Sequence, residues 1–250
     1  MVIGSGVAGL SAALELAQSG ISVEIIEKSD FAGGHAIRLA CKATDKCVKC
    51  GACVVEEKLD RAVRNSGIRI LTGSRIESIS KNERYAIGLN QKPKYINAQK
   101  CTACGVCLHQ CPQEGAIIQG VSRNHSPFFS INEKECLYLA DQSCRRCQEA
   151  CPEKAIALDA RADRVVCEAD AIVLATGFAT FNPKDKPYGY GVFKNVVTNV
   201  ELEDILRREG QAIRPSDGQP ARKIAFIQCV GSRDAKLNHL WCSKICCGSA

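Results

Sequence analysis

Residues 1–27 read MVIGSGVAGLSAALELAQSGISVEIIE, and this stretch decides the fold. An apolar start runs into a glycine turn, and small and apolar residues follow as expected of a helix. Gly4 allows a tight turn, Gly6 lets the backbone approach a pyrophosphate, and Gly9 lets helix and strand pack closely. The next apolar stretch ends at Glu27, whose carboxylate can accept hydrogen bonds from ribose hydroxyls. The pattern predicts the strand, turn and helix of a Rossmann-type dinucleotide-binding domain.

Later segments favour FAD over NAD as the dinucleotide, since Glu27 suits either. Lys28 is followed by a glycine pair, and residues 70–76 form a strand-like stretch. The apolar run 171–174 leads into the turn 175–177, which resembles the strand and turn that close the FAD domain in flavoproteins of the thioredoxin reductase type. An ordinary strand-end turn is the alternative. We predict an FAD site formed by Gly4, Ser5, Gly6, Val7, Ala8, Gly9, Glu27, Lys28, Gly33, Gly34, Ile76, Ala175, Thr176 and Gly177.

Cysteine usage bears on the compartment and on metal chemistry. The 250-residue chain has 17 cysteines and opens directly on its first strand, with no charged and apolar leader. We therefore expect a cytoplasmic protein without disulfides, whose closely spaced cysteines are metal ligands or redox thiols. No run reaches about 18 apolar residues, so we expect no membrane span. The apolar start is shorter than the usual strand of about five or six residues, which indicates a truncated piece of a longer chain.

Two cysteine runs in the middle of the chain repeat each other. The first has the bacterial ferredoxin spacing C-x2-C-x2-C-x3-C-P, and the second has C-x7-C-x2-C-x3-C-P. An Ile-Asn pair precedes each run, at Ile96 and at Ile131. The first run is Cys101, Cys104, Cys107 and Cys111, and the second is Cys136, Cys144, Cys147 and Cys151. The repeat predicts two 4Fe-4S clusters.

The fourth cysteine of each run is expected to cross to the other cluster, as in two-cluster ferredoxins. One cluster would then take Cys101, Cys104, Cys107 and Cys151, and the other Cys136, Cys144, Cys147 and Cys111. Structural zinc is the alternative, but zinc usually draws its four thiolates as two separated pairs. Three cysteines at consecutive intervals of three suit a cubane better.

Eight further cysteines fall into two outer sets. One set is Cys41, Cys47, Cys50 and Cys53, and the other is Cys229, Cys242, Cys246 and Cys247. Additional 4Fe-4S clusters are one interpretation of both sets. The alternatives are a redox-active dithiol at Cys47 and Cys50 and a vicinal thiol pair at Cys246 and Cys247. Cys167 is left over, and we expect it to be a packed core thiol.

The formal net charge of +6 raises the question of a nucleic-acid partner. That sum counts cysteines as neutral, whereas four thiolates around a 4Fe-4S core add about two negative charges per site. Four such sites would cancel the excess. No stretch combines clustered Lys and Arg with aromatic residues, so we expect no nucleic-acid partner.

Together these motifs resemble the heterodisulfide reductase A subunits and their relatives in sulfur-oxidising and sulfate-reducing microbes. The resemblance is most specific in FIQCVGSRD at 226–234 and WCSKICC at 241–247. It also rests on the glycine loop, the cysteines of 47–53, the paired ferredoxin runs and residues 175–178, 188–191 and 214–218. The resemblance implies that the C-terminal cysteines ligate a cluster close to the flavin. The cysteines of 41–53 look closer to the sulfur-oxidation relatives.

These motifs predict an α/β protein: a Rossmann-type, thioredoxin-reductase-like FAD-binding domain with an inserted α+β two-cluster ferredoxin domain. Residues 1–95 and 161–218 form the FAD domain in two parts, and 96–160 form the insert. Residues 219–250 start a truncated second nucleotide-type domain, with a first strand at 223–230.

The function that we expect is that of an oxidoreductase subunit. It would pass electrons between FAD and 4Fe-4S clusters, with other subunits of a heterodisulfide-reductase-like complex and electron donor or acceptor proteins as partners. Those subunits would act on disulfide or sulfane-sulfur substrates, and no residue of this chain is predicted to be catalytic. A homodimer is left open. The alternative is a polyferredoxin-like electron carrier without functional flavin.

Overall fold

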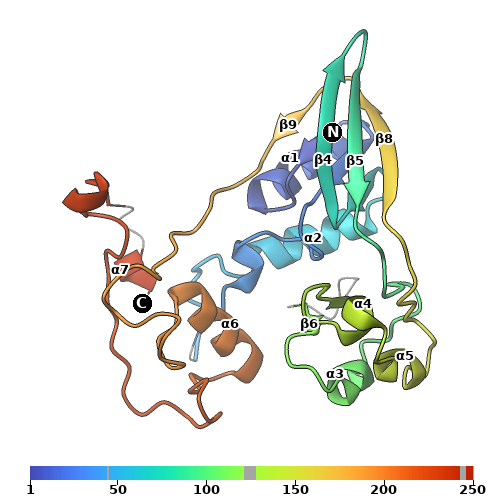
Figure 1. Cartoon of the computed structure of the whole chain (residues 1–250). Helices are drawn as coiled ribbons and strands as arrows, with labels where there is room; N and C mark the ends of the chain where they lie inside the picture. Colours follow the sequence, from blue (N-terminus) through green and yellow to red (C-terminus); the bar gives the residue numbers. More distant parts are fainter. Residues whose placement is uncertain (44, 121–127, 243–245, 250) are drawn as a thin grey trace. The chain divides into compact units, whose positions relative to one another are not determined.

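The computed structural model describes residues 1–43, 45–120, 128–242 and 246–249 (Figure 1). The chain divides into two compact units. Unit 1 takes Met1–Ile37 and Cys53–Gly177, and unit 2 takes Arg38–Ala52 and the chain from Phe178 onward. Among the described residues, we find no helix with the length and apolar character needed to cross a membrane.

A parallel sheet with two helices forms the start of unit 1. Its strands are β1 (Val2–Ile3), β2 (Val23–Ile26), β3 (Ile68–Leu71) and β9 (Val173–Leu174), in the order β3-β2-β1-β9. Helix α1 (Val7–Gln18) buries Leu10, Ala13 and Leu14, and α2 (Val54–Arg64) buries a stripe at helical spacing. These side chains form one core with the sheet. The predicted Rossmann-type arrangement is confirmed.

An antiparallel sheet follows in the same unit. It contains β4 (Ser74–Lys81), β5 (Tyr85–Gln91) and β8 (Asp163–Ala169), which lie side by side in Figure 1. The prediction of one strand-like stretch at 70–76 is wrong. Gly73 has φ +62 and turns the chain, so residues of this stretch belong to β3 and to β4. Cys167 lies in the core beneath this sheet, as predicted.

Residues 96–160 have a core of their own. The segment contains the strands β6 (Ile117–Gln119) and β7 (Phe129–Ile131) and the helices α3 (Val106–Gln110), α4 (Leu137–Asp141) and α5 (Arg146–Glu149). Its two cysteine repeats exchange backbone contacts: Asn97 N–H donates to the carbonyl of Ala155 at 2.7 Å, and Asn132 N–H to that of Ala116 at 2.9 Å. The start of each repeat therefore pairs with the end of the other.

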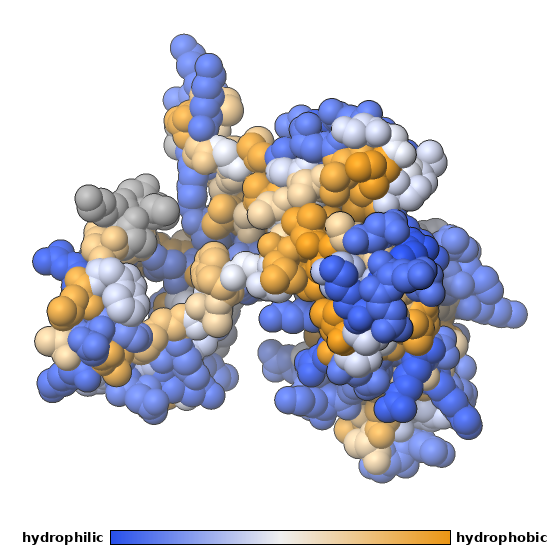
Figure 2. All heavy atoms as spheres, turned by 90° about the horizontal axis from the view of Figure 1, so that it is seen from above, coloured by the Kyte–Doolittle hydropathy of each residue, from blue (hydrophilic) through white to orange (hydrophobic). Residues whose placement is uncertain are grey.

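Unit 2 is organised around helix α6 (Asn199–Glu209), with short helices η2 (Ala235–Leu237) and α7 (Cys246–Ser249) further on. The predicted strand at 223–230 is wrong. A strand needs a neighbour that accepts and donates its backbone hydrogen bonds, and no described residue pairs with this stretch as a strand. Its large apolar side chains Ile224, Phe226 and Ile227 are exposed. Figure 2 shows that other surface regions of the molecule also mix hydrophobic with hydrophilic residues.

Candidate functional site

The glycine loop joins β1 to α1 with a geometry that depends on its three glycines. Gly4 has φ +106, and a Cβ there would lie 2.2 Å from the carbonyl oxygen of Ala175. A Cβ on Gly9 would lie 1.9 Å from the carbonyl oxygen of Gly4. Gly6 is the N-cap of α1, and a Cβ there would meet no atom within 4 Å. The first and third glycines allow close packing, whereas the second leaves space in front of the free N–H groups of a helix.

The structure brings most of the predicted FAD residues to this loop. Gly33 N–H donates to the carbonyl of Ser5 at 3.1 Å, and a Cβ on Gly34 would lie 2.9 Å from the Cα of Gly6. Ile76 instead packs against the core beneath the antiparallel sheet. The predicted residues that are exposed to solvent are Val7, Ala8, Lys28, Thr176 and Gly177.

Glu27 is buried at the end of β2, and both of its carboxylate oxygens are bonded. Oε2 accepts from the backbone N–H of Ser5 at 3.0 Å and from its hydroxyl at 2.6 Å. Oε1 accepts from the backbone N–H of Ser29 at 2.9 Å and from its hydroxyl. Burial raises the pKa of Glu27, but the hydrogen bonds from Ser29 and Ser5 outweigh it and lower the pKa. Glu27 is therefore an anion that ties the glycine loop to the end of β2.

Ser29 is the residue of this site that the sequence analysis missed. The sequence feature that could have indicated it is a serine two residues after a glutamate, since such a hydroxyl can donate a hydrogen bond to the nearby carboxylate. A carboxylate has about four acceptor positions, and the two serines occupy four. Ser5 is fully buried, whereas Ser29 is exposed. A ribose hydroxyl that binds Glu27 would therefore displace the Ser29 hydroxyl rather than Ser5.

The eight cysteines of residues 96–160 surround two cavities, four on each. One cavity is lined by Cys101, Cys104, Cys107 and Cys151. The other is lined by Cys111, Cys136, Cys144 and Cys147. The fourth cysteine of each run thus lies on the cavity of the other run. No three Cys, His, Asp or Glu side chains within the described ranges converge closely enough to hold a single metal ion.

The chemistry of these cavities fits a cationic iron-sulfur core. Burial, followed by charge repulsion from neighbouring cysteines, raises the pKa of both Cys107 and Cys147 to about 11. A bound cation offsets such repulsion and keeps thiolates deprotonated. A backbone group also contacts one of the cavity sulfurs: the N–H of Ala155 donates to the Sγ of Cys151 at 3.3 Å.

The first outer set lies on an exposed segment. Cys41, Cys47 and Cys50 belong to unit 2 and are exposed, and Cys53 precedes α2 in unit 1. The backbone N–H groups of Ala52 and Lys42 lower the pKa of the Cys50 thiol.

The C-terminal set gathers near the start of α7. Negative charge on Cys246 and burial raise the pKa of the Cys247 thiol, and a hydrogen bond with Cys246 and the charges of Cys229 and Cys242 add to the shift. Cys229 has φ +61, a left-handed conformation that is uncommon outside glycine. Such backbone strain is frequent at functional sites.

Comparison with known proteins gives two kinds of similarity. A family model described as an NAD(P)-binding Rossmann-like domain matches residues 2–52. The H(2):CoB-CoM heterodisulfide,ferredoxin reductase A subunit of Methanothermobacter marburgensis is 30% identical over 99% of this chain and 39% of its own length. The second CoB--CoM heterodisulfide reductase iron-sulfur A subunit of Methanopyrus kandleri is 34% identical over the same shares. The chain is a homologue of the heterodisulfide reductase A subunits.

The homology to heterodisulfide reductase A subunits covers only part of each relative. A third one, the ferredoxin/F(420)H(2)-dependent CoB-CoM heterodisulfide reductase A subunit of Methanosarcina acetivorans, is 32% identical over 100% of this chain and 33% of its own length. The chain thus spans 33–39% of these relatives. Among solved structures, L-proline dehydrogenase from P. horikoshii is 28% identical, covering 36% of this chain and 18% of that chain, with a TM-score of 0.30.

Proposed function

We propose that this chain is a cytoplasmic electron-transfer flavoprotein subunit of a heterodisulfide-reductase-like complex. Residues 1–95 and 161–218 would bind FAD, residues 96–160 would be a two-cluster ferredoxin insert, and residues 219–250 would open a second nucleotide-type domain. The homology to heterodisulfide reductase A subunits supports this role. The Rossmann-like match supports the nucleotide site.

The observation that carries the proposal is the pair of four-cysteine cavities. Each cavity takes three cysteines from one repeat and one from the other. That crossed arrangement is the ligation pattern of two-cluster ferredoxins. Cys107 on α3 and Cys147 on α5 are close enough for the charge of Cys107 to act on Cys147. Two adjacent cavities of this kind suit electron transfer through the insert.

The residues of the glycine loop would bind and orient the dinucleotide. The N-terminus of α1 offers N–H groups to a pyrophosphate across the open side of Gly6. Glu27 would hold a ribose hydroxyl once the Ser29 hydroxyl has turned away. Bound FAD would accept two electrons and release them singly, and each 4Fe-4S cluster would carry one.

The outer cysteine sets would hold a third and a fourth cluster. The charges of Cys246, Cys229 and Cys242 all act on the Cys247 thiol, which supports ligation of one cluster by that set. Partner subunits would act on a disulfide or sulfane-sulfur substrate, and electron donor or acceptor proteins would exchange electrons with this chain.

Iron and flavin content of the anaerobically purified protein tests the proposal. We expect one FAD and, from four sets of four cysteines, about 16 iron atoms per chain. A reproducible value of about 8 would leave only the insert clusters. Protein that releases no flavin on denaturation would instead support the polyferredoxin-like carrier.

A matched pair of cysteine variants tests the crossed cavities directly. Cys151→Ala should remove the cluster signal that Cys101→Ala also removes, because both line the same cavity. Cys167→Ala is the control, since this thiol is buried in a different core. Loss of the Cys144 cluster in Cys151→Ala, with the Cys101 cluster intact, would contradict the crossing.

A further inference from the structure

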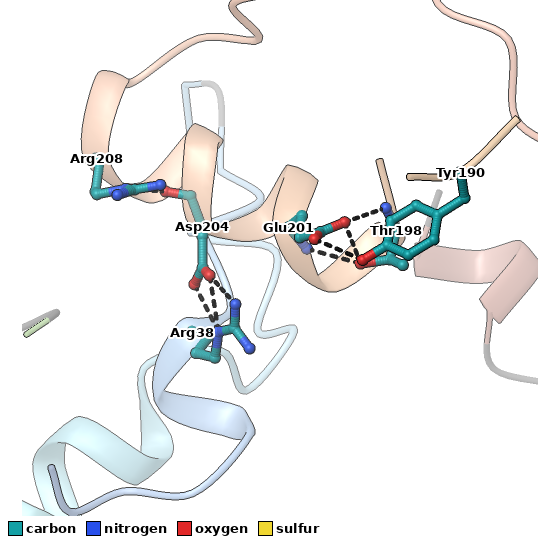
Figure 3. A network of polar contacts seen from close by, with 6 residues as sticks. All are labelled: Arg38, Tyr190, Thr198, Glu201, Asp204 and Arg208. Atoms are coloured by element: carbon teal, nitrogen blue, oxygen red, sulfur yellow. Dashed lines mark hydrogen bonds and ion pairs between the residues drawn. The ribbon is translucent and has the colours of Figure 1, made fainter. Parts of the chain in front are cut away.

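Helix α6 holds the backbone on both sides of Cys41. Figure 3 shows the first contact, in which Asp204 on α6 faces Arg38. The Nε of Arg38 donates to the two carboxylate oxygens of Asp204 at 2.9 and 2.8 Å. One turn along α6, the guanidinium of Arg207 donates to the carbonyl of Leu39 at 3.0 Å. The chain that leads into Cys41 is therefore attached to one face of this helix.

Glu203 on the same helix contacts both neighbours of Cys41. One carboxylate oxygen accepts the backbone N–H of Ala40 at 2.7 Å. The other forms an ion pair with the ammonium of Lys42. Glu203 is 7% exposed, and a carboxylate buried to this degree needs such partners to offset its lost hydration. Its two bonds therefore fix residues 40 and 42, with Cys41 between them.

The N-terminal end of α6 is itself tied down. Thr198 and Glu201 form a reciprocal capping box, with the Thr198 hydroxyl accepting the Glu201 N–H at 3.3 Å and a Glu201 oxygen accepting the Thr198 N–H at 2.6 Å. The Tyr190 hydroxyl donates to the other Glu201 oxygen at 2.9 Å (Figure 3). The helix is thus a fixed support for Glu203.

We propose that Glu203 is the positioning residue for Cys41 in the first outer cysteine set. The inference extends the proposed function, in which this set holds a cluster. By fixing residues 40 and 42, Glu203 sets where the Cys41 thiol lies. The position of this ligand would thus depend on one carboxylate that lies more than a hundred residues further along the chain.

The test compares Glu203→Gln with Glu209→Gln in the anaerobically purified chain. Glu209 lies on the same helix and is exposed, so its variant is a matched control. Hydrogen exchange of the Ala40 amide, followed in a peptide of residues 38–43, should be about tenfold faster in Glu203→Gln, since a bond to a charged acceptor is weakened. The same variant should lose about four iron atoms and the cluster signal that Cys47→Ala removes, with flavin and insert signals unchanged.

Rescue distinguishes positioning from a general loss of stability. Lys42→Met added to Glu203→Gln should restore part of the cluster signal, because the ammonium no longer faces a neutral amide. Lys42→Met alone removes the ion pair with Glu203 but keeps the hydrogen bond to Ala40, so the rate of alkylation of the Cys41 thiol should rise only slightly. If Glu203→Gln does not fold, Lys42→Met takes its place as the test variant. Equal exchange in the two glutamine variants would overturn the proposal, and so would faster exchange with unchanged Cys41 alkylation and iron content.

A different result would contradict the proposed function without contradicting the role of Glu203. If Cys47→Ala keeps the full iron content and every cluster signal of the parent chain, the first outer set holds no cluster. The positioning of Cys41 is then decided by exchange of the Ala40 amide and by the alkylation rate of Cys41 in Glu203→Gln. Rates equal to those of Glu209→Gln would overturn it, and faster rates would support it.

Discussion

Replacing Glu27 with Gln should weaken FAD binding and lower stability together. The carboxylate accepts two backbone N–H groups and two hydroxyls. A Gln side chain keeps one carbonyl oxygen and turns an NH2 group toward the other serine. The hydroxyls can rotate to accept from that NH2 group, but one buried backbone N–H loses its acceptor.

The loss of that hydrogen bond sets the magnitude. A bond to a charged acceptor contributes about 1.5–3 kcal/mol. For a chain of this size, about 2 kcal/mol corresponds to a Tm lower by about 4–8 °C. The same energy lost from the ribose contact would raise the Kd for FAD about tenfold or more. Iron content should stay at the parental value, because Glu27 lies outside residues 96–160.

Ser29→Ala is the control for this prediction. It removes a hydroxyl that the ribose would displace, so it should cost about 1 kcal/mol of stability without weakening FAD binding. The assay is FAD release on serial dilution, followed by flavin fluorescence, together with thermal unfolding. Parental Kd and Tm in Glu27→Gln would refute the assigned role of Glu27, and equal loss of FAD in both variants would refute the displacement of Ser29.

Three further predictions concern the pH dependence of stability, the C-terminal cysteines and Asp30. The hydrogen bonds to Glu27 outweigh its burial and hold its pKa below the ordinary 4.5. Its contribution to stability is therefore complete above pH 4.5 and is lost as the pH falls through the folded-state pKa. When Tm is measured against pH, it should fall more steeply on acidification in the parent than in Glu27→Gln. Cys242→Ala should remove about four iron atoms and one cluster signal, and an unchanged iron count would make the C-terminal set ordinary thiols. The carboxylate of Asp30 forms an ion pair with the ammonium of Lys92 at 3.1 Å and accepts a hydrogen bond from the Ser130 hydroxyl at 2.8 Å. Asp30→Ala should therefore lower the free energy of unfolding by about 1–2 kcal/mol and speed amide exchange in β7. Unchanged exchange would show that Asp30 does not hold this strand.

Features that depend on local spacing could be predicted from the sequence. The glycine loop and the end of β2 at Glu27 each rest on residues a few positions apart. Composition without a partner strand, by contrast, predicts two strands incorrectly. Gly73 divides the stretch 70–76, and residues 223–230 lack a partner strand among the described residues. Apolar composition does not supply the hydrogen-bond partner that a strand requires.

Contacts between distant segments could not be predicted, because no periodicity links them. Glu203 reaches Ala40 across 163 positions of the chain, and a glutamate on an amphipathic helix is ordinarily a solvated residue. Its burial follows only from the folding of residues 38–42 onto α6.

The crossing of the cysteines shows how repetition can supply what spacing cannot. Each repeat begins with an Ile-Asn pair and ends with Ala-Ile, and the structure pairs the beginning of each with the end of the other, as Ile96 with Ile156 and Ile117 with Ile131. A cysteine just before the end of one repeat is carried by that pairing to the cavity of the other. Neither repeat by itself contains four cysteines around one cavity. Each site therefore needs both repeats, and unfolding of either repeat should disturb both sites, whereas loss of a single ligand should disturb one.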